Sequence, residues 1–176
     1  MRTGGGPGRS SGGTYALFLV LDEGLTIKVG SLGEHRFPRG AYVYAGSAEG
    51  GLGPRLLRHA RDQKNVHWHV DHLTIREECQ VVGAVTFPPG TLGECDIVES
   101  LGRLQWVEVA PPGFGATDHR CPGHLVRLGE RPYLLELAVL TLEEEGGSWL
   151  SFDGIMRPGG PERDGGRDGS RPLTEK

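Results

Sequence analysis

Residues 14–48 read TYALFLVLDEGLTIKVGSLGEHRFPRGAYVYAGSA, and this stretch decides the fold. Residues 15–21 form a continuous apolar run, which predicts a buried β-strand. A turn at residues 22–24 and an alternating run over 25–29 predict a hairpin between these two segments. The aromatic and β-branched run at 41–45 predicts a third strand. The stretch therefore indicates a small antiparallel sheet.

Helical and strand-like patterns alternate after this stretch. Residues 54–63 predict a helix with a core stripe, and residues 66–75 a second, short helix. The first stripe comprises Leu52, Leu56, Leu57 and Ala60, and the second Val66, Val70 and Leu73. A strand is expected at 81–87 and a helix at 92–104, with Ile97, Val98, Leu101 and Leu104 facing inward.

The last third of the chain has weaker patterns. Residues 106–109 and 124–128 have strand character, whereas 133–142 is open between strand and helix. We therefore expect an α/β (α+β) fold, with a small, mostly antiparallel sheet of three or more strands flanked by helices.

The two ends of the chain are rich in glycine and poor in apolar residues. Residues 1–13 and 157–176 cannot bury apolar surface, so both are expected to be disordered tails. Residues 14–156 are expected to form one domain, which is long enough to bury a core without disulfides or metals.

Charge, apolar content and cysteine spacing argue against a polycationic, a membrane-spanning and a disulfide-rich secreted protein. The net charge is −4, so any nucleic-acid-binding surface must be a local basic patch. No apolar run is long enough to span a bilayer, and no signal peptide is recognisable. The three cysteines do not have the spacing of a disulfide framework, which favours a reducing, cytoplasmic compartment.

A basic cluster lies on the helix predicted at 54–63 and just beyond it. Within ten residues only Asp62 offsets its positive charge, and its members are Arg55, Arg58, His59, Arg61 and Lys64. Arg55 and His59 are four residues apart and share a helix face, where they could meet one phosphate. The alternative is an ordinary solvated helix face.

Glu94 occupies a position at which its helix pattern predicts an apolar residue. A carboxylate that faces a core needs a metal ion, a cation or a set of hydrogen bonds. The competing interpretation is a capping box over residues 91–94, in which Glu94 would accept a hydrogen bond from the backbone N–H near Thr91.

Two further segments are rich in histidine or cysteine. Residues 67–72 read HWHVDH, but a helix would point these side chains to different sides, so we expect His69 or His67 to assist a site without sharing one ion. A second segment offers ligands for a structural zinc ion. The four candidate zinc ligands are Cys95, His119, Cys121 and His124.

Several of these residues resemble the GIY-YIG nuclease superfamily. Residues 13–15 (GTY) and 44–46 (YAG) stand where that signature has its two tripeptides, with the isoleucines replaced. A longer match is to an uncharacterised branch of the superfamily, of the domain of unknown function 123 type. Its recurring strings stand here at 40–48, 58–61, 67–71, 94–101 and 113–125.

The resemblance implies hydrolysis of a phosphodiester bond by a one-metal mechanism, with Glu94 binding Mg²⁺ or Mn²⁺. It also implies that Arg55 stabilises charge on the phosphate. Tyr15 or Tyr44 would accept the proton from water, with His59 as the competing base. Arg58, Arg61, Lys64 and His69 are expected to bind the nucleic acid.

Three functions are therefore weighed. The first is a metal-dependent endonuclease acting on nucleic acid, for which DNA is the expected substrate and no membrane partner is expected. The second is a nucleic-acid-binding module that retains the fold without the chemistry. The third is a structural protein organised by zinc.

Overall fold

A computed structural model describes residues 11–117 and 121–153 of the chain. Its central layer is a six-stranded sheet in which every pair of neighbours is antiparallel. In spatial order the strands are β6 (Glu108–Val109), β7 (Leu125–Gly129), β4 (Gly40–Ala48), β1 (Gly13–Leu21), β5 (Cys79–Phe87) and β8 (Ser148–Ser151).

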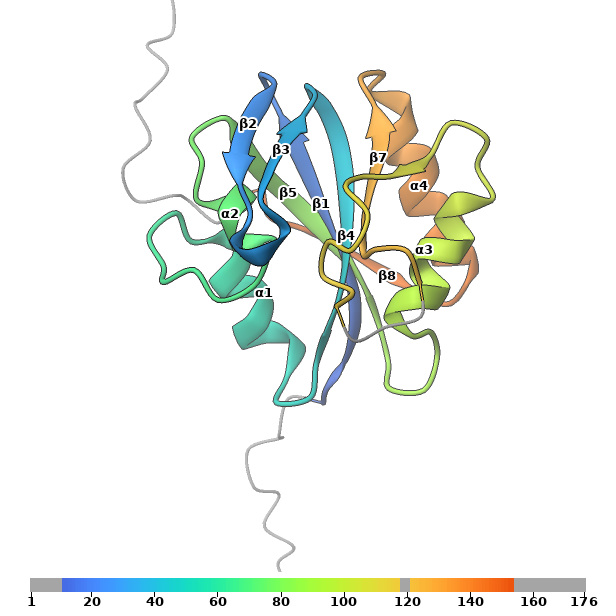
Figure 1. Ribbon diagram of the computed structural model, residues 1–176. Helices are drawn as coiled ribbons and strands as arrows, with labels where there is room; N and C mark the ends of the chain where they lie inside the picture. Colours follow the sequence, from blue (N-terminus) through green and yellow to red (C-terminus); the bar gives the residue numbers. More distant parts are fainter. Residues whose placement is uncertain (1–10, 118–120, 154–176) are drawn as a thin grey trace, which may run out of the picture.

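Both faces of this sheet are covered (Figure 1). Helices α1 (Leu52–Ala60) and α2 (Asp71–Thr74) lie on one face, together with a hairpin of β2 (Leu25–Lys28) and β3 (Glu34–Phe37) joined by the short helix η1 (Gly30–Leu32). Helices α3 (Glu94–Gly102) and α4 (Tyr133–Glu144) lie on the other face.

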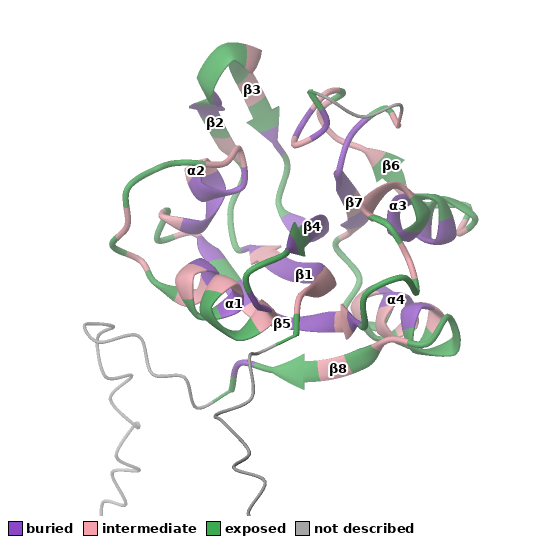
Figure 2. Ribbon diagram, turned by 90° about the horizontal axis from the view of Figure 1, so that it is seen from below, coloured by how far each residue is buried: buried purple, intermediate pink, exposed green. Residues whose placement is uncertain are grey.

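Strand β1 explains why the chain needs two covering layers. Its side chains alternate between the faces, so Leu17 and Leu19 enter the core beneath α1 and α2, whereas Ala16 and Phe18 enter the core beneath α3 and α4. Figure 2 shows the central strands buried and β8 exposed at the edge of the sheet. The continuous apolar run therefore belongs to a strand that is buried on both faces.

The expected fold class is confirmed, but the first hairpin was predicted wrongly. Strand β2 pairs with β3 and not with β1. Both edges of β1 are already occupied, by β4 and by β5, so its backbone has no edge left for β2. Strands β3 and β8 were not predicted, because both are short and carry few apolar residues.

Two helices also differ from their predicted limits. Helix α1 ends at Ala60, and Leu57 is 50% exposed, whereas His59 takes a buried position. The helix predicted at 66–75 is a single turn, because the backbone before it is held by the carboxylate of Asp71, which accepts hydrogen bonds from the N–H groups of His67 and Trp68. The ambiguous run at 133–142 lies within a helix, α4.

The limits of the domain can be compared only in part with the prediction. Strand β1 begins at Gly13, one residue inside the predicted first tail, while residues 1–10 and the predicted tail at 157–176 lie outside the described residues. None of the helices in the described part of the chain combines the length and apolarity that a bilayer crossing requires.

Candidate functional site

A solvent-accessible cavity of about 350 Å³ lies at the end of the sheet where β4 leads into α1. We call it the tyrosine cavity, after the two tyrosines in its wall. It brings together four of the five residues predicted to be catalytic, each from a different element: Tyr15, Tyr44, Arg55 and Glu94. The other lining residues are Gly46, Ser47, Glu49, Gly50, Trp68 and Gly115.

The register of the central strands places the two tyrosines together. Tyr15 of β1 pairs with Gly46 of β4, and Tyr44 pairs with Leu17, so both tyrosine side chains project from the same face of adjacent strands. A Cβ on Gly46 would clash with the Tyr15 ring, so glycine is required there for the ring to lie across β4. A Cβ on Gly115, at φ +72°, would lie 2.9 Å from the Tyr44 ring.

Glu94 reaches this cavity from the opposite layer of the fold. Strand β7 pairs with β4 only over residues 41–44, so within the described residues the last part of β4 has no strand partner on that side. Helix α3 begins beside this open end, and Glu94 is its first residue. The carboxylate therefore lies at a helix N-terminus, where the helix dipole stabilises negative charge.

The competing interpretation of Glu94, a capping box over residues 91–94, is wrong. The residue that precedes α3 is Gly93, and its backbone N–H donates a hydrogen bond of 2.7 Å to the Asp96 carboxylate. Asp96 is therefore the carboxylate that caps α3. Glu94, for which the sequence pattern allowed this role, lines the tyrosine cavity instead.

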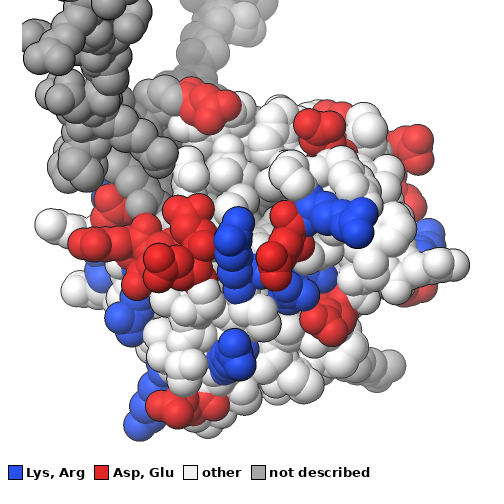
Figure 3. Space-filling view, turned by 90° about the horizontal axis from the view of Figure 1, so that it is seen from above, with Lys and Arg blue, Asp and Glu red and all other residues white. Residues whose placement is uncertain are grey.

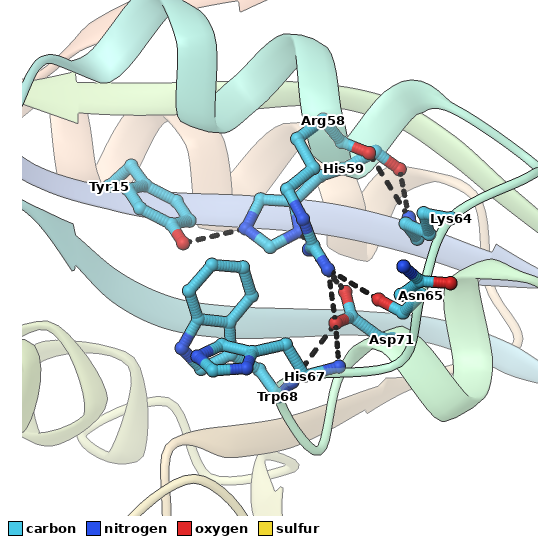
Figure 4. Close-up of polar contacts among 8 residues, drawn as sticks. All are labelled: Tyr15, Arg58, His59, Lys64, Asn65, His67, Trp68 and Asp71. Atoms are coloured by element: carbon cyan, nitrogen blue, oxygen red, sulfur yellow. Dashed lines mark hydrogen bonds and ion pairs between the residues drawn. The ribbon is translucent and has the colours of Figure 1, made fainter.

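Behind the cavity, three buried polar groups lie close together (Figure 4). The Tyr15 hydroxyl lies 2.7 Å from Nε2 of His59, whereas Nδ1 of His59 lies 4.0 Å from the Asp71 carboxylate and has no hydrogen-bond partner among the described residues. Burial, followed by the charge of Lys64, lowers the pKa of His59 to about 3. The ring is therefore neutral at pH 7, so its Nε2 can accept a hydrogen bond from the Tyr15 hydroxyl, which places the ring proton on Nδ1.

Asp71 is held by four hydrogen bonds. It accepts two hydrogen bonds from the Arg58 guanidinium, at 2.8 and 2.9 Å, and two more from backbone N–H groups. Burial would raise the pKa of Asp71, but these hydrogen bonds outweigh it and lower the pKa to about 2. The contribution of this carboxylate to stability is therefore present above its unfolded pKa and is lost as the pH falls towards 2.

The two tyrosine hydroxyls are protonated at neutral pH. Burial raises the pKa of Tyr15 well above its ordinary value, and the neighbouring Tyr44 adds to this effect. Burial also raises the pKa of Tyr44, followed by the charge of Glu94, whereas the positive charge of Arg55 lowers it. The tyrosines are thus hydrogen-bond donors unless positive charge near them increases.

Trp68 holds the arginine of the cavity in place. The Arg55 guanidinium lies 4.0 Å from the centre of the Trp68 ring, and the Arg58 guanidinium lies 4.3 Å from it. Such cation–π contacts favour a planar guanidinium over the ring face. Since Arg58 is fixed by Asp71, the buried pair and Trp68 together position Arg55 at the cavity.

Comparison with known families gives one assignment. The profile of a domain of unknown function, DUF123, matches residues 14–145, which include every element that lines the tyrosine cavity. The chain belongs to the DUF123 family. No curated protein and no solved structure matches the chain significantly. The function of this DUF123 domain must therefore be argued from the geometry of its site.

The basic cluster of the DUF123 domain is largely engaged in internal contacts. Arg58 binds Asp71 and the Asn65 carbonyl, and the Lys64 ammonium donates hydrogen bonds to the carbonyls of His59 and Arg58 at the end of α1. These two residues thus have structural partners that the sequence did not predict, while Arg61 is exposed.

His69 likewise has an internal partner, since its Nδ1 accepts the N–H of Gly115 at 2.9 Å and so fixes one wall of the cavity. Burial, followed by the charge of His72, lowers the pKa of His69. Away from this site, the face seen in Figure 3 mixes both signs of charge and offers no broad basic surface.

Three site residues were not predicted as such, namely Trp68, Asp71 and Glu49. Trp68 and Asp71 lie within the string HWHVD at residues 67–71. The combination of an acid and an indole with two histidines was the sequence signal that could have identified them as site residues. Their roles depend on contacts with α1 that the string does not contain. Glu49 is an exposed residue of the turn after β4, and no sequence pattern marks it.

The predicted zinc ligands are partly brought together. Cys95 and Cys121 form a disulfide, which the spacing had not suggested, and Nε2 of His124 lies 3.7 Å from the Cys95 sulfur. His119 lies outside the described residues. Cys79 is a buried thiol in β5 and is not part of this group.

The buried neutral His59 predicts a specific loss of stability in mild acid. Its folded pKa is below its unfolded pKa, so the unfolded chain binds more protons and stability falls as the pH drops below about 6.5. The slope should approach about 1.4 kcal/mol per pH unit between pH 6 and 5. Urea unfolding of the DUF123 domain at several pH values measures it.

The matched variants for this measurement are His59→Gln and His67→Gln. Replacing His59 should flatten the slope, whatever it does to stability at pH 7, whereas replacing the exposed His67 should preserve it. An unchanged slope in the His59 variant would show that this imidazole is protonated in the folded domain.

Proposed function

We propose that this DUF123 domain is a metal-dependent endonuclease of the GIY-YIG type, which hydrolyses phosphodiester bonds in nucleic acid, with DNA as the expected substrate. The observation that carries the proposal is the convergence of Tyr15, Tyr44, Arg55 and Glu94 on one open cavity. Packing, solvation or capping would not require these four residues to meet, whereas phosphodiester hydrolysis needs a proton acceptor, a cation and a metal ligand around one phosphate.

The cavity has donors that suit a hard divalent cation. Mg²⁺ prefers carboxylate oxygens, keeps several waters and needs few protein ligands. Glu94 lines the cavity and is the proposed ligand, and the exposed Glu49 provides a second carboxylate in the same wall. When bound there, Mg²⁺ or Mn²⁺ would supply Lewis-acid stabilisation of the phosphate.

Arg55 is the proposed phosphate ligand. Its stacking on Trp68 orients a guanidinium fork at the cavity, where it can donate two hydrogen bonds to phosphate oxygens. Arg58 is not assigned this task, because Asp71 already occupies its fork. Arg61, exposed at the end of α1, remains the proposed contact with more distant phosphates.

Tyr44 is the proposed proton acceptor for the attacking water. His59 has only 1% of its surface exposed, does not line the cavity, and makes its hydrogen bond to the Tyr15 hydroxyl. Tyr15 is thus a hydrogen-bonded partner of His59 that orients groups in the cavity, whereas Tyr44 lines the same wall beside Glu94. Only the phenolate of Tyr44 can accept that proton, so Tyr44 would first release its own proton to solvent. Burial opposes this ionisation, and the positive charge of Arg55 and of a bound cation would favour it.

The proposal predicts cleavage that depends on a divalent cation. Labelled duplex DNA, flap and single-stranded DNA, and RNA would be incubated with the purified chain and Mg²⁺, Mn²⁺ or a chelator. We expect cleavage of at least one substrate with either cation and none with the chelator. The Arg55→Lys variant, which keeps the charge and removes the planar fork, should lower the rate by about 100-fold.

Two outcomes would contradict the proposal. If all substrates remain intact with either cation but bind in a salt-dependent manner, the domain is a nucleic-acid-binding module. If none binds at any salt concentration, the tyrosine cavity serves a different class of ligand.

A further inference from the structure

A second group of metal-ligand types lies next to the tyrosine cavity. Cys95 follows Glu94 in the first turn of α3, while Cys121 and His124 lie in the chain between β6 and β7. The two sulfur atoms and a ring nitrogen of His124 all lie within 4.8 Å of one another. Two chain segments that are distant in sequence therefore bring two sulfurs and an imidazole to one point.

The spacing of these atoms suits a tetrahedral zinc ion. Bond lengths of about 2.3 Å to sulfur and about 2.0 Å to nitrogen place two such ligands about 3.5 Å apart. The observed distance from Cys95 Sγ to His124 Nε2 is 3.7 Å. The Cα atoms of the two cysteines are 5.7 Å apart, so modest rotation of their side chains would separate the sulfurs enough to hold one ion.

The surroundings make the site both ordered and accessible. His124 is buried, with 1% of its surface exposed, and its backbone N–H and C=O bond to Phe114 and Ala45. The cysteines are half-buried and line a separate cavity of about 580 Å³, through which a reductant or an ion can reach the sulfurs.

We propose that Cys95, Cys121 and His124 form a redox-controlled zinc site, in which zinc binding and the Cys95–Cys121 disulfide exclude each other. A dithiol reductant transfers two electrons and two protons to the disulfide and leaves as its own disulfide. The two thiols then release two protons as Zn²⁺ binds their thiolates and the His124 nitrogen. The fourth ligand position is left for water or another donor.

This site is chemically distinct from the tyrosine cavity. Thiolate and imidazole ligands select zinc, whereas carboxylates and water select magnesium. In both redox states the start of α3 stays linked to the segment that contains Gly115, a residue of the tyrosine cavity wall. The zinc site is independent of the proposed nuclease activity, and it can be tested without nucleic acid.

The test is a metal titration of the full chain in two redox states. One sample is reduced with a phosphine and freed of metal, and the other is oxidised, with its thiols counted under denaturing conditions. Co²⁺ is the spectroscopic probe, and Zn²⁺ then displaces it. We expect one equivalent of Co²⁺ with a thiolate-to-metal charge-transfer band in the reduced chain, and no such band in the oxidised chain.

Variants separate zinc binding from general stability. Cys121→Ser should lower Zn²⁺ affinity by more than about 100-fold, because even the loss of an outer-shell partner costs 10–100-fold. His124→Asn should lower it with the charge-transfer band retained, and Cys79→Ser is the matched control that should bind normally. Equal zinc affinity in the two redox states, or in Cys121→Ser, would overturn the proposal, with folding of each variant checked by circular dichroism.

Discussion

Replacing Glu94 with glutamine should lower metal-dependent cleavage by about 1,000-fold or more, since the loss of one preorganised electrostatic group already costs 100–1,000-fold. Glutamine keeps the size of the side chain and the position at the start of α3. It removes the charge that the proposed divalent cation would need in the tyrosine cavity. The rate of cleavage under single-turnover conditions, at saturating Mg²⁺ and at several Mg²⁺ concentrations, measures the effect.

The stability of the same variant decides how that loss is interpreted. The substitution removes a favourable helix-dipole interaction, so unfolding should become easier by no more than about 1 kcal/mol. Glu99→Gln, an exposed residue of the same helix, is the matched control and should leave cleavage unchanged. A normal rate and Mg²⁺ dependence in Glu94→Gln would show that Glu94 is not the metal ligand, and Glu49 would then be the next carboxylate to test.

The core of the fold was predictable because its signals are local. The apolar run in β1, the aromatic run in β4 and the stripe on α3 each specify an element from its own residues. The pairing of strands is not local. Strand β2 follows β1 in sequence and was expected to pair with it, but that edge of β1 pairs with β5, which begins 51 residues after the end of β2 by the strand limits. Short strands such as β3 and β8 form because a neighbouring edge exists, not because their own composition demands it.

The candidate site was predictable to a different extent. The resemblance to a nuclease family pointed to Tyr15, Tyr44, Arg55 and Glu94, and these residues do meet. From their spacing, Arg58 and Lys64 were expected to bind phosphate. That expectation failed to include the hydrogen-bond acceptors that other segments supply, because the sequence around a basic residue does not reveal them. Here those acceptors are the Asp71 carboxylate and the final carbonyls of α1. Only tertiary contacts distinguish an available cation from one already bound.

The Arg58–Asp71 pair is a position where substitution should be costly. Asp71 is fully buried, and its two oxygens accept four hydrogen bonds from a guanidinium and two backbone N–H groups. Removing one partner of such a pair leaves the other charge without its counter-ion, which is costly, whereas replacing both partners is better tolerated. The pair also supports Trp68 and, through it, Arg55.

We therefore expect Asp71→Asn to destabilise the domain by about 3 kcal/mol, at the lower end of the range for broken buried pairs because Arg58 is 24% exposed. The amide NH₂ of asparagine would face an N–H donor at a position where a carboxylate oxygen now accepts a hydrogen bond. Urea unfolding measures the change, and Asp22→Asn, in an exposed turn, is the matched control. Combining Asp71→Asn with Arg58→Met should cost clearly less than the sum of the single variants, because the second change removes the unpaired charge. Additive losses would show instead that the two residues stabilise the fold independently, with Asp71 acting mainly through the N–H groups of His67 and Trp68.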